Sequence, residues 1–474
     1  MKKIIIVFAF IGMITACSGL VDGLNNDPNN PTSASYEYIL TGAEVGNAIF
    51  QTGESARRAG IFAGYYTGID RQHQGFSNYT LTTSDFDDLW EDAFVKVLRN
   101  SIETEIAANE EGVVGIATGI TQVLQALTFG TTASLFGDIP FEEAGTLAAE
   151  NPMFVDQQQV YANVQLLLDE AIDNLGAGTG RPAGGSELYF DGNPTAWTQV
   201  AYTLKARFYM HTKEYANAYT AAQNGISSAG NSMRMPHGTA ADNSNLNFQF
   251  FAIQVRQSDL VTSDFMTSLV APTAETNPNL ANYRGNTKTD ETARYNYLFR
   301  QTSFGTQPNT LDNGYAAQVA PADIVTYREN LLILAEAGLR TVDFTTALGH
   351  LNDFRAYMDA GGYMTNPNMA DVNYDAYLST DFDNGGMENL DGVSPNDALL
   401  REILQEKYVS LFGQIEGFND VRRTLDETIV RVPVQPNTGS ILPQRFIYPQ
   451  TEIDRNSNTP DPIPNLFDRT SVNQ

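Results

Sequence analysis

The sequence predicts a mainly α-helical protein in which four antiparallel helical hairpins form a scaffold and an irregular, loop-rich half packs on it. Apolar residues recur at helical spacing in several neighbouring pairs of segments, as expected of helical hairpins. Long segments rich in Gly, Asn, Thr and Tyr separate these pairs. Hydrophobic residues make up 42% of the 474 positions, so the chain can bury a large core.

The first residues look like an export signal. Lys2 and Lys3 precede an apolar run, residues 4–14, that is too short to span a bilayer, which needs ~20 residues. Two small residues follow, and then Cys17, the only cysteine in the chain. A cysteine directly after Ile-Thr-Ala resembles a bacterial lipobox, in which the thiol is acylated. We therefore predict a lipoprotein signal peptide over residues 1–16 and lipidation of Cys17; an ordinary signal peptide is the alternative.

Residues 17–35 are predicted to be a lipidated tether. Pro28 and Pro31 stand among Asn and Asp there, a composition that favours turns and opposes helix. The remainder, residues 36–474, is predicted to form a single domain.

The first two hairpins are expected at about residues 36–107 and 112–175. Their helices are predicted over residues 36–50, 84–107, 112–134 and 156–175. Ser84 is the candidate N-cap of the second helix. In the fourth helix the apolar residues fall on one face, which predicts an amphipathic helix.

The third and fourth hairpins are expected at about residues 195–228 and 322–358, followed by a further helix over 400–412. Their helices are predicted over residues 195–211, 213–228, 322–339 and 344–358. Trp197 lies on an apolar stripe and is therefore expected in the core. Helical pairs packed through small Ala residues resemble tetratricopeptide units; because their spacing is irregular, an unrelated helical bundle is the alternative.

Three loop segments lie between the pairs, at residues 176–193, 229–321 and 361–395. Loops of this length inside a compact protein are usually functional or carry short strands of their own.

The chain is strongly acidic, with a formal net charge of −28. Such a charge repels phosphate backbones and anionic headgroups, so nucleic-acid binding is not expected. A neutral ligand is favoured slightly over a polyanionic one.

The sequence carries no local enzyme motif. The four His residues are scattered, no HExxH is present, and Cys17 is assigned to lipid. The segment 371–375 resembles the start of a calcium loop, but Ala376 replaces the required Gly and Phe382 takes the twelfth position. We therefore expect no catalytic residue, no metal and no cofactor, with a structural calcium as the minor alternative.

Two loop segments interleave aromatic rings with polar groups. This pattern suits carbohydrate binding, since rings stack on sugar C–H faces while amide, carboxylate and guanidinium groups meet the hydroxyls. The first group is Tyr65, Tyr66, Arg71, His73, Gln74, Phe76, Asn78 and Tyr79. The second group is Tyr283, Arg284, Asn286, Tyr295, Tyr297, Phe304 and Tyr315. We predict that some of these side chains face a ligand; the alternative is that the rings only hold the loops in place.

Charged residues near the C-terminus have structural interpretations. Arg422 and Arg423 are predicted to pair with carboxylates. Glu402, Glu406 and Lys407 are predicted to form a solvated or ion-paired helix face.

Short stretches along most of the chain also match one family pattern. They are Leu24–Pro31, Leu135–Ala144, Val160–Tyr161, Leu168–Ala171, Lys205–Arg207, Ala335–Ala337, Glu406–Tyr408, Asp420–Thr424 and Pro443–Gln450. Together with Cys17 they resemble the SusD/RagB family of Bacteroidetes outer-membrane lipoproteins, particularly its SusD-like branch. Phe418 stands where this pattern has Trp, which is a conservative departure.

The resemblance implies a scaffold of four tetratricopeptide-like hairpins. It also implies a non-catalytic, lipid-anchored protein at the cell surface that captures glycans and delivers them to a SusC-like, TonB-dependent outer-membrane transporter. The alternatives are a RagB-like lipoprotein that captures peptides, a surface glycoside hydrolase, and an assembly scaffold without a small ligand.

Overall fold

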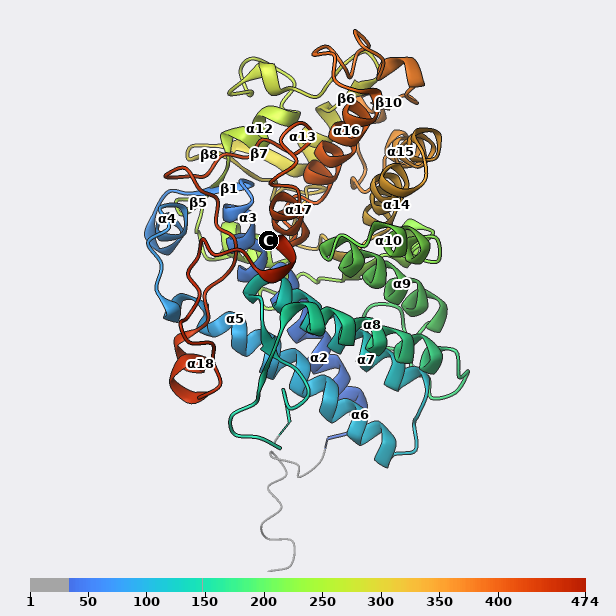
Figure 1. Cartoon of the computed structure of the whole chain (residues 1–474), viewed down its shortest axis with the longest axis vertical. Helices are drawn as coiled ribbons and strands as arrows, with labels where there is room; N and C mark the ends of the chain where they lie inside the picture. The colour runs from blue at the N-terminus through green and yellow to red at the C-terminus, as the bar shows by residue number, and fades with distance from the viewer. Residues whose placement is uncertain (1–33, 147) are drawn as a thin grey trace, which may run out of the picture.

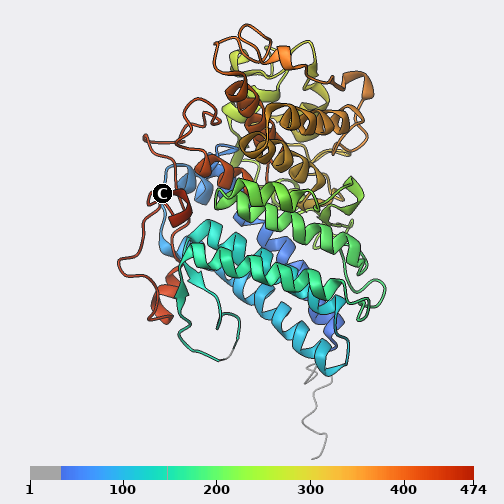
Figure 2. The ribbon, with the colours of Figure 1, turned by 45° about the vertical axis from the view of Figure 1, so that its right-hand side comes forward.

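The computed structural model describes residues 34–146 and 148–474 (Figure 1). The predicted signal peptide, Cys17 and tether residues 17–33 lie outside the described residues. In the described part, helices stack through one side of the molecule, while loops and short strands make up the other (Figures 1 and 2).

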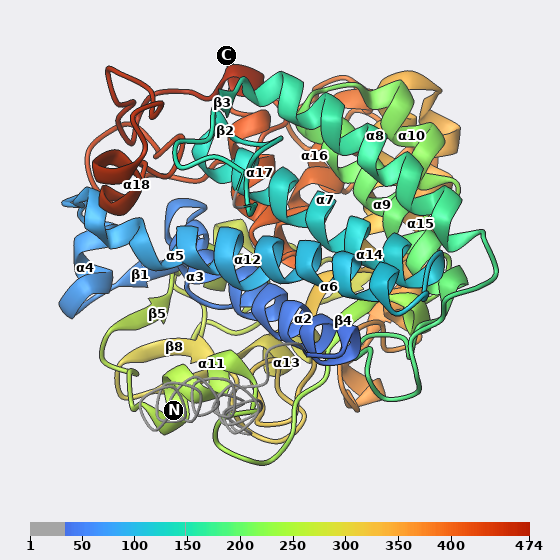
Figure 3. The same ribbon diagram turned by 90° about the horizontal axis from the view of Figure 1, so that it is seen from below.

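The scaffold is a succession of paired helices, each packed on the next. Its helices are α2 (Tyr36–Thr52), α6 (Asn100–Glu110), α7 (Ile116–Phe136), α8 (Gln157–Leu175), α9 (Pro194–His211), α10 (Tyr215–Ala222), α14 (Tyr327–Thr341) and α15 (Phe344–Asp359). In sequence, α2 packs on α6, α7 on α8, α9 on α10 and α14 on α15. Figure 3 shows α2, α6, α7, α8 and α9 side by side. The predicted mainly helical fold with tetratricopeptide-like packing is confirmed.

The helix predicted over residues 84–107 is built from several pieces. A 3₁₀ turn (Thr83–Phe86), α5 (Asp87–Glu91) and a π-helical stretch (Asp92–Arg99) lead into α6. The prediction of Ser84 as N-cap is wrong, because Thr82 occupies that position. The Thr82 backbone N–H donates to the Asp85 carboxylate at 2.7 Å as part of a capping box.

Two predicted boundaries move because tertiary contacts override local preference. Residues Ala322–Val325 form strand β9, so α14 begins at Tyr327, after the capping box of Thr326 and Glu329. Helix α10 ends at Ala222, short of the predicted residue 228. Gly225 follows closely, where an added Cβ would lie 2.2 Å from Asn330 Oδ1.

Helix α7 forms the centre of the scaffold, and all of its residues are buried. A Cβ at Gly130 would lie 2.2 Å from the Phe208 ring of α9, and one at Gly119 would lie 2.7 Å from Leu175 of α8. The two glycines therefore allow both neighbouring helices to approach α7 closely. Trp197 of α9 is fully buried in the same core, as predicted.

Within residues 34–146 and 148–474, the loop-rich half carries five antiparallel pairs of short strands. They are β1 (Tyr66–Gly68) with β5 (Leu260–Thr262), β2 (Ile139–Pro140) with β3 (Phe154–Val155), β4 (Met233–Met235) with β9, β6 (Thr289–Asp290) with β10 (Asn373–Tyr374), and β7 (Phe299–Thr302) with β8 (Gly305–Pro308). Most of these pairs join segments far apart in the sequence. The expectation that the long loops carry short strands is confirmed for residues 229–321 and 361–395, whereas residues 176–193 form no strand.

Further helices, most of them shorter, fill the spaces between these pairs. They are α3 (Glu54–Phe62), α4 (Arg71–Ser77), α11 (Leu246–Phe248), α12 (Asp264–Val270), α13 (Thr292–Leu298), α16 (Pro395–Ser410), α17 (Glu416–Arg423) and α18 (Gln450–Arg455). Among the described residues, no helix combines the length and apolarity needed to cross a membrane.

The two C-terminal arginines behave differently. Arg423 pairs with Glu336 at 2.7 Å and with Asp420 at 2.6 Å, as predicted. Arg422 instead donates to the backbone carbonyls of Gln444 and Ser134, at 2.7 and 2.8 Å. The prediction of a carboxylate partner is therefore wrong for Arg422, although its role in holding the C-terminal segment stands.

Candidate functional site

A cleft of about 520 Å³ opens in the loop-rich half, between α12, α16 and the loops at residues 281–286 and 387–391. We call it the loop cleft. Its volume lies within the range of ~300–1,000 Å³ typical of small-ligand sites.

One side of the loop cleft is apolar. Phe265 and Leu269 of α12 line it, together with Met387, Pro433 and Leu390. Leu390 is 82% exposed, which is the greatest exposure among the large apolar side chains of the described part. A patch of this kind at the mouth of a polar cleft is suited to the C–H surface of a ligand.

Tyr283 supplies an aromatic ring to the cleft, and Gly285 sets the position of that ring. A Cβ at Gly285 would lie 2.2, 2.3 and 2.5 Å from Cε1, Cζ and Oη of Tyr283. Only glycine therefore allows the ring to lie against its own loop. Burial raises the pKa of Tyr283 to about 12, so its hydroxyl stays protonated and available as a donor at neutral pH.

The polar side of the loop cleft is held by hydrogen bonds within the protein. Asn286 Nδ2 and the Tyr377 hydroxyl both donate to Glu388 Oε1, each at 2.7 Å. Arg401 makes a bidentate pair with Asp391, at 2.8 and 2.9 Å. These contacts fix the carboxylates in place, so a ligand would meet oriented acceptors.

A buried ionic cluster forms the base of the cleft. Arg284 reaches Glu402 at 2.8 Å, Glu406 at 2.9 Å and Glu291 at 3.1 Å. Arg294 reaches Glu406 at 2.7 Å and Glu291 at 2.9 Å. The cluster thus sets three carboxylates against two guanidinium groups, which leaves one carboxylate in excess.

The excess is relieved at Glu402. Burial, aided by the charges of Glu388 and Glu406, raises the pKa of Glu402 to about 8 even though Arg284 opposes the shift. Burial also disfavours the charge of Glu406, but Arg294 and Arg284 outweigh it and hold the pKa of Glu406 well below its usual range. With Glu402 protonated, the cluster has no net charge at neutral pH.

The structure corrects the exposure expected for half of the first predicted group. Tyr65, Tyr66, His73 and Phe76 are at most 1% exposed. Tyr65 packs its ring on Tyr408 at a centroid distance of 4.5 Å and donates its hydroxyl to the Tyr408 carbonyl at 2.7 Å. These rings anchor the loop to the core, so the prediction that they face a ligand is wrong.

The remaining members of the first group lie on or beside α4, outside the loop cleft. Arg71 is half exposed and donates to Asp259 at 2.8 Å through Nε. Gln74 and Asn78 are exposed. Tyr79 is half-buried, and its hydroxyl accepts the Asn437 N–H at 2.9 Å. Ligand contact by these four residues stays a prediction.

The second predicted group divides. Tyr283, Arg284 and Asn286 line the loop cleft. Tyr295 is 7% exposed, and so its predicted exposure is wrong. Tyr297 and Tyr315 are half-buried and pack edge to face at a centroid distance of 6.4 Å. Phe304, at the tip of the β7–β8 hairpin, is 46% exposed.

Sequence reasoning missed the part of the site contributed by α16. Arg401 and Gln405 line the cleft from this helix, and Glu388 and Asp391 come from the loop before it. The expected helix face at Glu402, Glu406 and Lys407 is ion-paired, but it is buried and not solvated. A sequence signal was present, since Ser394 and Pro395 mark a helix start five residues before the predicted one.

Comparison with known proteins supports the fold. The sequence model of the SusD-like family described as "Starch-binding associating with outer membrane" matches residues 28–449. This chain belongs to the SusD-like family. No curated protein sequence matches it.

Several solved structures share the fold of this SusD-like protein. A SusD/RagB family protein from Bacteroides thetaiotaomicron VPI-5482 superposes with a TM-score of 0.65 at 19% identity, covering 90% of this chain and 95% of its own. A chitin-binding SusD homolog from Flavobacterium johnsoniae superposes with a TM-score of 0.65 at 16% identity, covering 93% of this chain and 97% of its own. A SusD homolog from Bacteroides fragilis NCTC 9343 superposes with a TM-score of 0.63 at 18% identity, covering 93% of this chain and 100% of its own.

Proposed function

We propose that this SusD-like protein is a non-catalytic glycan-binding lipoprotein that captures oligosaccharides in the loop cleft. The observation that carries the proposal is the family match over residues 28–449, because that family is described as starch-binding and associated with the outer membrane. A relative with the same fold is described as chitin-binding.

The chemistry of the loop cleft supports this proposal. Leu390 and the ring of Tyr283 offer apolar surface to sugar C–H faces, while Asn286, Gln405 and Asp391 offer hydrogen-bonding groups. The neutral base around Glu402 suits an uncharged glycan. Since sugar hydroxyls exchange water for protein partners of similar strength, we expect a Kd between roughly 1 μM and 1 mM.

The proposed role ends with handover to a SusC-like, TonB-dependent transporter. Acylation of Cys17 would fix the protein to the outer membrane, exposed at the cell surface. Tethering raises the effective concentration of the bound glycan near the transporter, so weak binding suffices and also permits release.

Calorimetric titration and affinity electrophoresis against starch, chitin oligosaccharides, mannan, fructan and a peptide panel test the proposal. We expect binding to one neutral glycan class, no release of reducing ends, and weaker binding by Leu390→Gln and Asn286→Ala. Arg455→Ala, which changes an exposed arginine of α18 outside the cleft, is the control. Binding to peptides only, or cleavage of the glycan by the purified protein, would contradict the proposed function.

A further inference from the structure

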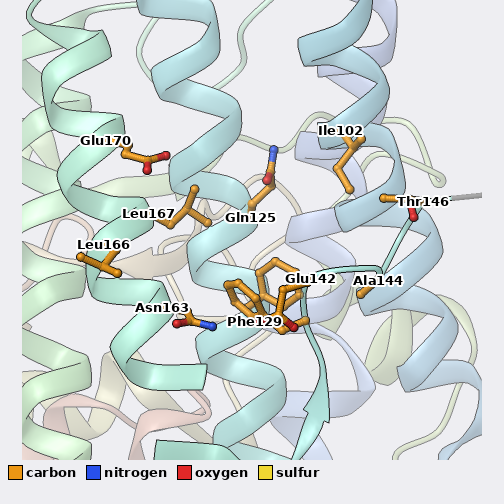
Figure 4. A pocket seen from close by; sticks show the side chains of 11 residues that line it. Ile102, Gln125, Phe129, Glu142, Ala144, Thr146, Asn163, Leu166, Leu167 and Glu170 are labelled. Atoms are coloured by element: carbon orange, nitrogen blue, oxygen red, sulfur yellow. The ribbon is translucent and has the colours of Figure 1, made fainter. Parts of the chain in front are cut away.

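A second hollow of about 330 Å³ lies on the helical scaffold, between α6, α7, α8 and the loop at residues 141–146. We call it the helical groove. Figure 4 shows Phe129 of α7 at its floor, between Leu166 and Asn163 of α8 on one side and Ile102 of α6 on the other. No lining residue is shared with the loop cleft.

The floor and one wall of the helical groove are apolar. Phe129 and Phe141 pack against each other at a centroid distance of 4.2 Å. Leu166 is 63% exposed at the wall, beside the half-buried Leu167. These aromatic and aliphatic side chains offer no hydrogen bonds, so the groove suits the apolar body of a ligand.

The rim of the helical groove is acidic. Glu142 and Glu170 line it, and both are exposed. Glu105 is adjacent, since its carboxylate accepts Gln125 Nε2 at 3.3 Å and Gln125 also lines the groove. In the described part of the chain, none of these three carboxylates forms a salt bridge.

The nearby basic side chain is already engaged. Arg99 pairs with Glu103 at 2.6 Å and donates to the Gly145 carbonyl at 3.2 Å. Burial raises the pKa of Glu105, and the charge of Glu170 adds to this shift. The rim therefore holds unbalanced negative charge next to an apolar floor, and a cation placed there would relieve it.

We propose that the helical groove binds organic cations with an apolar body, such as an alkylammonium group or a Leu-Arg segment of a peptide. The apolar body lies on Phe129, Phe141 and Leu166, and the cationic head reaches Glu142 and Glu170. An anion is repelled by the same rim, and a neutral sugar leaves the charge of the rim unbalanced. This site does not depend on the function proposed for the loop cleft.

Three matched probes test the proposal: octylammonium, octanoate and octyl glucoside, each titrated calorimetrically below its micelle concentration. We expect octylammonium to bind at least tenfold more tightly than octanoate or octyl glucoside. We expect this preference to shrink at high salt, because the rim is exposed. Equal binding of the three probes would overturn the proposal.

Surface variants locate the site without threatening the fold. Leu166→Gln should weaken octylammonium binding several-fold, and Glu170→Lys should weaken it at least tenfold. The controls are Leu378→Gln, at a leucine that is 61% exposed, and Glu275→Lys, at an exposed glutamate. If the control variants weaken binding as much as the groove variants do, the cation binds the acidic surface in general and the proposal fails.

A fourth probe, N-acetyl-leucyl-arginine amide, which carries a single positive charge like octylammonium, distinguishes the two sources of such a ligand. Binding tighter than that of octylammonium indicates a peptide segment, and weaker binding indicates a free amine. Either result supports the groove as the site, provided that the dipeptide probe and octylammonium bind the Glu170→Lys variant with equal affinity. Binding of this probe that is unchanged in Glu170→Lys would contradict the proposal.

Discussion

Replacing Glu402 by Gln should change how the stability of the protein depends on pH. Glu402 lies in the buried cluster beneath the loop cleft, where its carboxylate accepts Arg284 at 2.8 Å. Gln keeps an oxygen that can accept this bond, but it cannot ionise. The variant therefore removes one titration while it preserves the shape of the side chain.

The sign and size of the effect follow from the raised pKa. The pKa of Glu402 is about 8 in the folded protein, against roughly 4.3 in an unfolded chain. Between these values the folded state holds a proton that the unfolded state has lost, so the free energy of unfolding falls as the pH rises. At ~1.4 kcal/mol per pH unit, the wild-type protein should lose roughly 5 kcal/mol through this group between pH 4 and pH 8.

Urea unfolding of both proteins from pH 5 to pH 9 measures the difference. We expect Glu402→Gln to gain stability relative to the wild type as the pH rises, and the gain to level off above about pH 8. The contrasting variant is Glu406→Gln, which removes the negative charge that Arg294 meets at 2.7 Å and should cost ~3–5 kcal/mol. Parallel stability curves for the wild type and Glu402→Gln would refute this account of the cluster.

Three further predictions concern binding, folding and anchoring. Gly285→Ala should displace the ring of Tyr283 and weaken glycan binding about 2- to 10-fold, as measured by calorimetry, while circular dichroism shows that the fold survives. Unchanged affinity would contradict the role of that ring. Phe76→Ala should cost ~3–5 kcal/mol of stability in chemical denaturation and leave glycan affinity unchanged, because this ring is buried. A variant that stays stable but binds the glycan more weakly would show that Phe76 faces the ligand after all. Cys17→Ala should remove the protein from the outer-membrane fraction; retention there would exclude the lipid anchor.

The helical scaffold could be predicted from the sequence because its determinants are local. The helix predicted at 195–211 begins at Pro194 in the structure, one residue earlier, since Asn193 caps it. The boundary errors arise where distant segments intervene. Strand β9, for example, forms because it pairs with the distant strand β4. The pattern of residues 322–325 alone does not predict that pairing.

The direction of the loop rings could not be predicted. Tyr65 and Tyr283 stand in similar surroundings of Gly, Tyr and polar residues. Tyr65 is fully buried on Tyr408, whereas Tyr283 lines the loop cleft. The difference depends on which distant element covers each ring, so composition identifies aromatic loops but not their exposed members.

The loop cleft is likewise assembled from segments that are distant in sequence. Tyr283 and Asn286 meet Glu388 and Arg401 only after folding, and the nearest of these contacts spans about a hundred positions. Composition therefore indicated the kind of chemistry, while the residues of α16 could be assigned only from the structure.

The paired strands have a consequence for how this architecture diversifies. Pairs such as β1 with β5 and β6 with β10 fasten two remote stretches of backbone at fixed points. Between such points a loop can lengthen, shorten or change composition while the helices stay where they are. Proteins that share this frame at 16–19% identity can therefore differ in the loops that surround it.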